Sequence, residues 1–449
     1  MSARKILIDM WAALQGPPET CQGVTFLGKG ALPSAFATSD FAAASTASAA
    51  LALADLIGCD QIQMDRRLSS FWFAKSIRPV GWSLPPQWDP IAGNYRAKDG
   101  WVRLHTNAAH HRKACLHVLG CAADGPSVAA CVADWSAQDL QEQIVAAGGV
   151  AAQMLSVINW QEHPQGKAVT QEPLVAWQTK TGPKLRAFGT PTRPLQGLRV
   201  LDLTRILAGP IATRFLAGFG ADVLRIDPPG WDEPAVLAEV TPGKTRARLD
   251  LRQWEDVVTF KKLLREADVL VHGLRADALA RLGLGEDERL RINPHLIDVA
   301  LNAYGWTGPW AHRRGFDTIV QMSTGLAHAE TKRAPSGEPL NLPVQALDYG
   351  TGHLMAAAVL RALSQARKDG ARMSARFSLA RTANYLSQWP CKHDSPFAGE
   401  DGDDLSPNME TTYWGQARRL KAPFILPSLD FFWSRPAGLL GDGLPRFGV

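Results

Sequence analysis

Asp348 is the residue of this sequence whose type and surroundings best suit a nucleophile. It opens the segment Asp-Tyr-Gly-Thr-Gly, which ends at Gly352. An aspartate with a pKa of about 3.9 is an anion at neutral pH and can attack an acyl carbon without a separate base. Gly350 and Gly352 would leave room for a substrate, and free backbone N–H groups there could stabilise an oxyanion. The alternative for an aspartate in this position is a helix N-cap or a turn residue.

A second aspartate, Asp40, starts a similar run of residues. Small residues and an alanine-rich helix pattern over 47–56 follow Asp40, and small residues and a helix pattern over 355–363 follow Asp348. In both cases a glycine and a further patterned segment come next, which indicates an internal duplication. Asp40 precedes Phe-Ala-Ala-Ala and no glycine-containing loop. We therefore interpret Asp40 as a relic of duplication or a helix cap.

The elements that must position Asp348 have the pattern of a parallel α/β sheet. Short apolar runs alternate with helical patterns from Leu198 onward. The predicted strands cover 199–203, 221–226, 247–251, 268–272 and 295–301, and the predicted helices cover 211–219, 254–266 and the surroundings of Leu279. Strands separated by helix-length segments indicate a parallel, Rossmann-like sheet that is covered on both faces.

Residues 80–190 have a different pattern and predict a smaller α+β domain. A turn-rich approach leads to a strand at 101–105, and helical patterns follow at 109–119, 137–147 and 150–159. The segment 189–197, with two prolines and two glycines, is the predicted linker. The predicted organisation is thus a repeat segment of the large domain carrying Asp40 (1–79), the small domain (80–190), the Rossmann-like large domain carrying Asp348 (191–393) and a covering C-terminal extension (394–449).

Composition predicts a globular protein without a nucleic-acid or membrane partner. The chain has 449 residues, 46% of them hydrophobic and 20% charged, which is enough for a full core and about two domains. Its formal net charge of +5 is spread over the chain and is not concentrated in a block. The six cysteines form no CxxC pair and no metal-ligand spacing, so we expect no metal and a reducing compartment. Without a secretion signal or an uncharged apolar stretch of bilayer length, the expected location is the cytoplasm.

Several motifs in order along the chain resemble the family III coenzyme A (CoA) transferases. The stretches 194–210 and 216–230 are similar to the opening of that family, which includes formyl-CoA and carnitine-CoA transferases and α-methylacyl-CoA racemase. Further matching pieces are Leu282-Gly-Leu-Gly285, Tyr304-Gly-Trp-Thr-Gly-Pro309, Gly315-Phe-Asp317 and the Asp348 segment, so the resemblance covers about 195–385. Residues 35–170 resemble the later half of the family, including Trp160-Gln-Glu-His-Pro-Gln165. Circular permutation with an overlapping repeat would explain this order.

The resemblance implies an enzyme that moves CoA between an acyl thioester and a carboxylic acid. Asp348 would form an aspartyl-acyl anhydride and then an aspartyl-CoA thioester, with CoA as a substrate, no cofactor, and a homodimer as the assembly. By position in the family motifs, Ile206, Leu207 and Ala208 would line the adenine and pantetheine path, Lys244, Arg275 and Arg281 would approach phosphates, and Arg314 would lie near the pantetheine. An ordinary solvated surface role is the alternative for each basic residue.

A helix beginning near Pro210 would offer unpaired N–H groups to the CoA phosphates. One helix end contributes about 0.3–1 kcal/mol, whereas a micromolar ligand needs about 8 kcal/mol. Basic side chains must therefore contribute to CoA binding as well.

Departures from the family pattern leave other functions open. Pro228 and Gly273-Leu274 stand where an arginine and Asn-Phe are usual, and Pro85-Pro-Gln-Trp-Asp-Pro90 occupies the region of a glycine-rich lid. Because of these departures, the alternative to a transferase is a non-catalytic protein that binds CoA or serves as a partner subunit. A racemase is the third choice, because Phe316 replaces the proton-exchanging histidine and His312 is a loop residue. A nicotinamide dehydrogenase is excluded because the turn after 199–203 lacks G-x-G-x-x-G.

Overall fold

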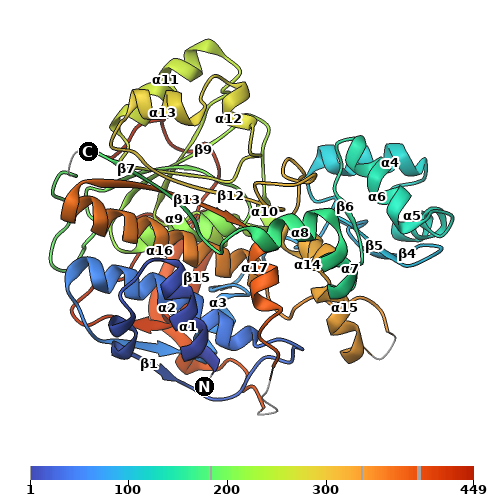
Figure 1. Cartoon of the computed structure of the whole chain (residues 1–449), viewed down its shortest axis with the longest axis horizontal. Coiled ribbons are helices and arrows are strands. Elements are labelled where there is room, and N and C mark those ends of the chain that lie inside the picture. The colour runs from blue at the N-terminus through green and yellow to red at the C-terminus, as the bar shows by residue number, and fades with distance from the viewer. Residues whose placement is uncertain (1, 183–184, 335–336, 392–395, 449) are drawn as a thin grey trace.

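A seven-stranded sheet at the centre of the molecule confirms the predicted α/β class (Figure 1). The computed structural model describes residues 2–182, 185–334, 337–391 and 396–448. The strands lie in the order β10 (Lys244–Arg248), β9 (Asp222–Asp227), β8 (Arg199–Leu203), β11 (Val269–His272), β12 (Ile297–Asn302), β13 (Ala371–Ser378) and β7 (Ala176–Thr181). All pairs are parallel except β13 with β7. Numbered along the chain from β8, the parallel strands have the order 3-2-1-4-5-6 of a doubly wound Rossmann sheet.

Helices cover both faces of this sheet because alternate strand residues point to opposite sides. Val200 belongs to the core beneath α9 (Ala208–Gly218) and α16 (Ala346–Asp369), and Leu201 belongs to the core beneath α11 (Trp254–Glu266). On the same face as α11 lie α12 (Ala278–Arg281) and α13 (Glu286–Ile292) (Figure 1). The bounds predicted for α11 match the structure, since its apolar residues recur at helical spacing.

The segment around α16 occurs twice in the molecule, which agrees with the predicted repeat. Helices α2 (Thr38–Ile57) and α16 each carry an aspartate at the third position, and each ends at a left-handed glycine, Gly58 or Gly370. A strand and a helix follow each of them, namely β2 (Ile62–Asp65) and α3 (Arg66–Trp72), or β13 and α17 (Leu379–Leu386). In addition, β2 has the parallel neighbour β1 (Val24–Leu27) and the antiparallel neighbour β16 (Phe424–Ile425), as β13 has β12 and β7.

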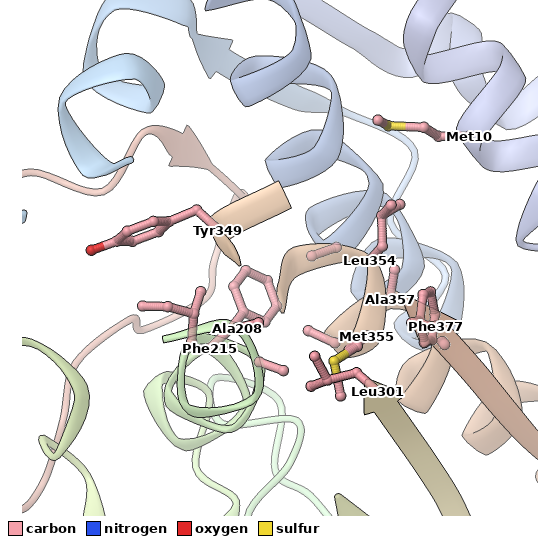
Figure 2. Packing of buried hydrophobic residues seen from close by; sticks show 14 of the residues in the cluster. Met10, Ala208, Phe215, Leu301, Tyr349, Leu354, Met355, Ala357 and Phe377 are labelled. Atoms are coloured by element: carbon pink, nitrogen blue, oxygen red, sulfur yellow. The ribbon is translucent and has the colours of Figure 1, made fainter. Parts of the chain in front are cut away.

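Helix α16 lies at the centre of the main hydrophobic core. Figure 2 shows Leu354, Met355 and Ala357 of α16 near Phe215 of α9 and near Leu301 and Phe377 of the sheet. Helix α2 packs along α16, and α1 (Ser2–Ala13) packs along α2. Helix α2 is long and apolar enough to cross a membrane, but 83% of its apolar window is buried in the protein, as expected for a core helix.

A small antiparallel sheet and three helices form a unit beside the main body (Figure 1). Strands β4 (Gly93–Arg96), β5 (Trp101–Leu104) and β6 (Ala151–Gln153) share a core with α4 (Ala109–Leu119), α5 (Gly125–Val132) and α6 (Ala137–Ala146). The helix predicted over 150–159 is wrong, because β6 occupies its first half and α7 (Val157–Glu162) starts later. Next come α8 (Pro164–Gln171) and β7, so the large sheet already includes residues before the predicted boundary at 190.

The remaining elements complete the main body. Helices α10 (Pro234–Val240), α14 (Asp317–Thr324) and α15 (Leu326–Glu330) connect the sheet strands. In the C-terminal part, β14 (Leu405–Thr412) and β15 (Gly415–Leu420) pair with β3 (Ile77–Pro79). The predicted boundary between 393 and 394 lies outside the described residues.

Candidate active site

Asp348 lies where two cavities meet. Cavity 1, of about 230 Å³, and cavity 2, of about 320 Å³, are both lined by Asp348, Ile206, Trp231 and Phe316. Asp348 is only 6% exposed, so its carboxylate is reached through these cavities. A reacting group placed between the cavities would contact the predicted nucleophile.

The position of cavity 2 follows from the topology of the sheet. The loops after β8 and β11, at 205–209 and 273–275, line it. These two strands are the point at which the strand order reverses, and ligands of open α/β sheets bind at the carboxyl ends of strands at such a point. Helix α9 begins there without a side-chain N-cap, and Ala208 and Gly209 of its first turn line the cavity. Its first N–H groups can therefore bind an anion.

Arginine side chains surround cavity 2. The four arginines of its lining are Arg205, Arg275, Arg313 and Arg314. Among the described residues, Asp348 is the one acidic residue in that lining. Burial lowers the pKa of Arg205, Arg313 and Arg314, and the charge of Arg275 lowers that of Arg314 further. Cations that repel one another around one cavity are favourable for an anionic ligand.

The turn between β8 and α9 is strained at Ile206. Its φ is +65°, a left-handed conformation that a β-branched residue rarely adopts. The backbone N–H of Ile206 donates to Glu233 at 2.9 Å, and Trp231 Nε1 donates to the same carboxylate at 3.0 Å. Arg225 donates to the other oxygen of Glu233 at 2.6 Å. This buried network holds Ile206 between the two cavities, where backbone strain is typical of functional sites.

A second carboxylate, Asp317, changes the electrostatics of Asp348. Asp317 Oδ2 accepts from the backbone N–H of Asp348 at 2.9 Å, and its other oxygen accepts from Gln321. Burial raises the pKa of Asp317 to about 6. Burial, and then the charge of Asp317, raise the pKa of Asp348 well above its ordinary value. The expectation of an ordinary, always ionised aspartate is therefore wrong for the ligand-free site.

The predicted binding residues divide between the cavities and other places. Ile206, Ala208, Arg275 and Arg314 line cavity 2, and Leu207 lines cavity 1. Arg205 and Arg313 also line cavity 2 but were missed. Arg205 lies in the turn directly after a predicted strand, and this position was the available signal. Arg313 could be placed only from the fold.

Lys244 does not reach either cavity, contrary to its predicted contact with phosphate. Its side chain is fully buried in β10 and forms an ion pair with Asp202 at 3.0 Å. Its other two hydrogen bonds go to Pro210 O at 2.9 Å and Thr213 Oγ1 at 2.7 Å. An ammonium group has three donors, so none is left for a ligand.

Arg281 is also outside both linings. Its side chain is 69% exposed and forms an ion pair with Asp277 four residues earlier in the chain. His312, the candidate replacement for a racemase base, is 66% exposed and lies 3.8 Å from Asp277. Neither residue faces Asp348 in this structure.

Gly350 and Gly352 serve helix packing and do not line the cavities. A Cβ atom on Gly350 would lie 2.2 Å from the Phe41 ring of α2. A Cβ atom on Gly352 would lie 2.4 Å from the carbonyl oxygen of Ala208 in α9. The prediction that these glycines make room for the substrate is wrong, because the space is taken by neighbouring helices.

Asp40 is held in a buried ion pair. Its Oδ1 accepts from Arg66 Nε at 2.8 Å and also from Arg66 Nη2. Asp40 lines neither cavity, and its side chain is not the N-cap of α2. The site at Asp348 therefore has no accessible counterpart at Asp40.

The fold and cavity 2 together define an α/β protein with an arginine-lined cavity at the carboxyl edge of a doubly wound sheet. Residues 195–411 match the model of CoA-transferase family III, which shows that this part of the chain is similar to that family. The chain is 34% identical over 194 residues to the "Probable fatty acyl-CoA transferase Rv3272" of Mycobacterium tuberculosis, covering 40% of this chain and 49% of the relative. It is also 34% identical to the mouse succinyl-CoA:glutarate CoA-transferase, covering 40% of this chain and 43% of the relative.

The chain thus spans about half the length of the curated relatives it matches. A crystal structure of Rv3272 from M. tuberculosis superposes with a TM-score of 0.39 at 30% identity, over 44% of this chain and 59% of that chain.

Proposed function

We propose that this protein is an acyl-CoA transferase with Asp348 as its nucleophile. The observation that carries the proposal is the position of Asp348 between an arginine-lined cavity and a second, largely apolar cavity. The phosphates of CoA fit the arginines and the N-terminus of α9. The acyl group then occupies cavity 1, with the thioester carbon at Asp348.

In this mechanism, a carboxylate oxygen of Asp348 attacks the thioester carbonyl, and the C–S bond breaks. The products are an aspartyl-acyl anhydride and the CoA thiolate. The thiolate then attacks the Asp348 carbonyl, releasing the first carboxylate and leaving an aspartyl-CoA thioester. An acceptor carboxylate repeats these steps in reverse, so CoA is transferred and Asp348 is regenerated.

The buried acid pair requires that the nucleophile lose its proton before attack. Because Asp317 and burial raise the pKa of Asp348, ionised Asp348 is a stronger base than an ordinary aspartate. The arginines of cavity 2 favour the ionised form once the pair has lost its proton, since opposite charges lower a carboxyl pKa. We propose that this pair keeps Asp348 reactive within a poorly hydrated site.

A racemase mechanism is less well supported, because His105, the one histidine in the described lining of cavity 1, is a weak base. Phe316 stands at the place of the expected histidine, and His105 stacks on it with ring centroids 4.0 Å apart. Burial, with the nearby charge of Arg103, lowers the pKa of His105 to about 3. Such an imidazole is a weak base for removing an α-proton. A non-catalytic CoA-binding protein is the remaining alternative.

A trapping experiment separates the transferase from the binding protein. The protein is incubated with acetyl-CoA and then with hydroxylamine, and the peptide containing Asp348 is analysed by mass spectrometry. A transferase gives a hydroxamate on Asp348, because hydroxylamine attacks the anhydride or the aspartyl thioester. The same peptide from Asp348→Asn gives none, and CoA transfer to a carboxylic acid falls at least 1000-fold.

The matched control is Asp287→Asn, which changes an exposed aspartate of α13. This variant should retain both the adduct and the transfer rate. An unmodified Asp348 peptide in a wild-type protein that binds CoA would show that the chain is a binding protein and not a transferase.

A further inference from the structure

We infer that the acyl group of the substrate is an uncharged aliphatic or aromatic group. It does not derive from a dicarboxylic acid, whose acyl group would carry a second carboxylate. This inference rests on the proposed function and concerns cavity 1. Among its described lining residues there is no lysine or arginine, whereas five of them are acidic: Asp89, Asp232, Glu233, Asp317 and Asp348. A substrate with a second carboxylate would bring a buried charge into the cavity without a cation to pair with.

Aromatic rings form one wall of cavity 1. Trp88 meets His105 edge to face at a centroid distance of 5.9 Å, and His105 stacks on Phe316 at 4.0 Å. At a pKa of about 3, His105 is neutral at physiological pH and adds no charge. Trp231, Pro234 and Val236 lie elsewhere in the lining. Such a surface favours flat or branched hydrocarbon groups.

One cation, Arg103, lies behind this wall. The guanidinium of Arg103 lies 4.9 Å from the centre of the Trp88 ring. Its Nε donates to Thr318 Oγ1 at 2.9 Å, and its Nη1 donates to Asn94 Oδ1 at 2.8 Å. Thr318 and Trp88 both line cavity 1, but Arg103 does not. The Trp88 ring therefore separates this cation from the substrate.

The acidic side chains of cavity 1 do not favour an acyl group with a positive charge either. Glu233 is paired with the buried Arg225 at 2.6 Å, and Asp89 lies 3.4 Å from Arg112. Asp317 holds the backbone of Asp348. Asp232 is exposed at the edge of the cavity. Most of the acidic charge is thus already engaged, and the interior presents mainly apolar atoms to a ligand.

The size of the cavity sets an approximate length for the acyl group. A volume of about 230 Å³ is enough for a short acyl group. A hexanoyl or phenylacetyl group fits this space. Long fatty acyl chains would have to extend beyond it.

The test compares donors that share CoA and differ only in the acyl group. We measure kcat/KM for CoA transfer to acetate from hexanoyl-CoA, phenylacetyl-CoA, succinyl-CoA and glutaryl-CoA. Hexanoyl-CoA and phenylacetyl-CoA should exceed both dicarboxylyl donors by at least 100-fold. Rates for succinyl-CoA or glutaryl-CoA within 10-fold of the uncharged donors would overturn the inference.

A variant of the wall checks the physical cause. Trp88→Ala removes the ring between Arg103 and the cavity, and should reduce the preference for phenylacetyl-CoA over succinyl-CoA at least 10-fold. The Kd of free CoA should stay within twofold, because Trp88 does not line cavity 2. The control is Trp254→Ala, since Trp254 is 73% exposed on α11. If Trp88→Ala keeps the wild-type preference for phenylacetyl-CoA over succinyl-CoA, the aromatic wall does not determine that preference.

Binding to the inactive Asp348→Asn variant separates this inference from the proposed function. By calorimetry, hexanoyl-CoA should bind this variant at least 10-fold more tightly than CoA, and succinyl-CoA should not. If wild-type protein transfers CoA from no donor but this order of affinities holds, the proposed catalysis fails and the pocket assignment stands. If succinyl-CoA binds as tightly as hexanoyl-CoA, the pocket assignment fails.

Discussion

At the residue scale, two neighbouring carboxyl groups set the protonation of the proposed nucleophile. Asp317 accepts a hydrogen bond from the backbone of Asp348, and both groups are buried. Burial raises both pKa values, and the negative charge of Asp317 raises that of Asp348 further. A protonated Asp348 cannot attack a thioester. Activity must therefore rise with pH as the pair loses its proton.

The pH profile of Asp317→Asn tests this electrostatic coupling. Removing the negative charge beside Asp348 lowers the pKa of the nucleophile. The acidic limb of kcat/KM should therefore lie at lower pH in Asp317→Asn than in the wild-type protein. A steady-state assay from pH 4 to 9 with saturating acceptor measures this limb. A limb at the same pH in both proteins would mean that Asp317 does not act on the nucleophile through its charge.

At the element scale, α16 both presents Asp348 and joins the neighbouring helices. Its first turn places the carboxylate between the cavities, and the glycines that follow allow close contact with Phe41 of α2 and with the backbone of α9. The segment Asp-Tyr-Gly-Thr-Gly therefore contains both the proposed nucleophile and two glycines that allow close helix packing. Because the same turn does both, packing changes there should alter the position of the nucleophile.

Gly350→Ala should destabilise the protein although alanine favours helices. The new Cβ would meet the Phe41 ring at 2.2 Å, and overpacking of this kind costs about 1–3 kcal/mol. Urea unfolding should show this loss as a lower midpoint. Gly125→Ala in α5 is the control, because its Cβ meets nothing within 4 Å, and its stability should be equal to or slightly above that of the wild type. Equal midpoints for both variants would contradict the proposed helix contact.

At the scale of the whole molecule, one chain provides both sides of the site. Residues 86–89 and 105–111 of the N-terminal half and residues 205–209 of the later half line the cavities together. The segment at 85–90, which replaces the glycine-rich lid in the sequence comparison, supplies Trp88 to cavity 1. Both halves of this chain thus contribute to the two cavities, and the predicted homodimer stays a prediction.

The arginines brought together at this scale should control CoA affinity. Arg275→Gln should raise the Kd of CoA about 10-fold, because it removes one cation from cavity 2. Arg281→Gln, only six residues further along the chain, should change it less than twofold because its side chain points to solvent beside Asp277. Calorimetry at two salt concentrations measures both effects. A larger effect for Arg281 would restore the assignment made from the sequence motif.

The repeat around Asp40 should be structural and not catalytic. Arg66→Met removes the guanidinium that pairs with Asp40 in the core and should cost about 3–5 kcal/mol of unfolding free energy. Asp40→Asn should keep the transfer rate within twofold of the wild type once the folded fraction is taken into account, because Asp40 lines neither cavity. Urea unfolding and the transfer assay test the two variants. A rate loss comparable to that of Asp348→Asn would assign a catalytic role to Asp40.

The sequence by itself indicated the parallel sheet, the resemblance to family III CoA transferases over about 195–385 and the internal duplication. Apolar runs and helix-length segments alternate locally, so the bounds of α11 and α4 could be predicted exactly. The duplication could be seen because Asp40 and Gly58 are separated by a similar number of residues as Asp348 and Gly370. The nucleophile candidate followed from the order of several motifs along the chain, because an aspartate before Tyr-Gly-Thr-Gly could by itself be a helix cap or a turn residue.

Only the tertiary structure decided which side chains line the two cavities. Lys244 and Arg275 are both cations near strand ends in the sequence, yet one is enclosed in the core with Asp202 and the other lines cavity 2. The raised pKa of Asp348 depends on Asp317, 31 residues away, and on burial by several helices. Trp88 and Arg103 take their roles from a domain packed against the sheet. Burial, charge pairing and cavity walls depend on contacts between distant segments, which spacing along the chain does not reveal.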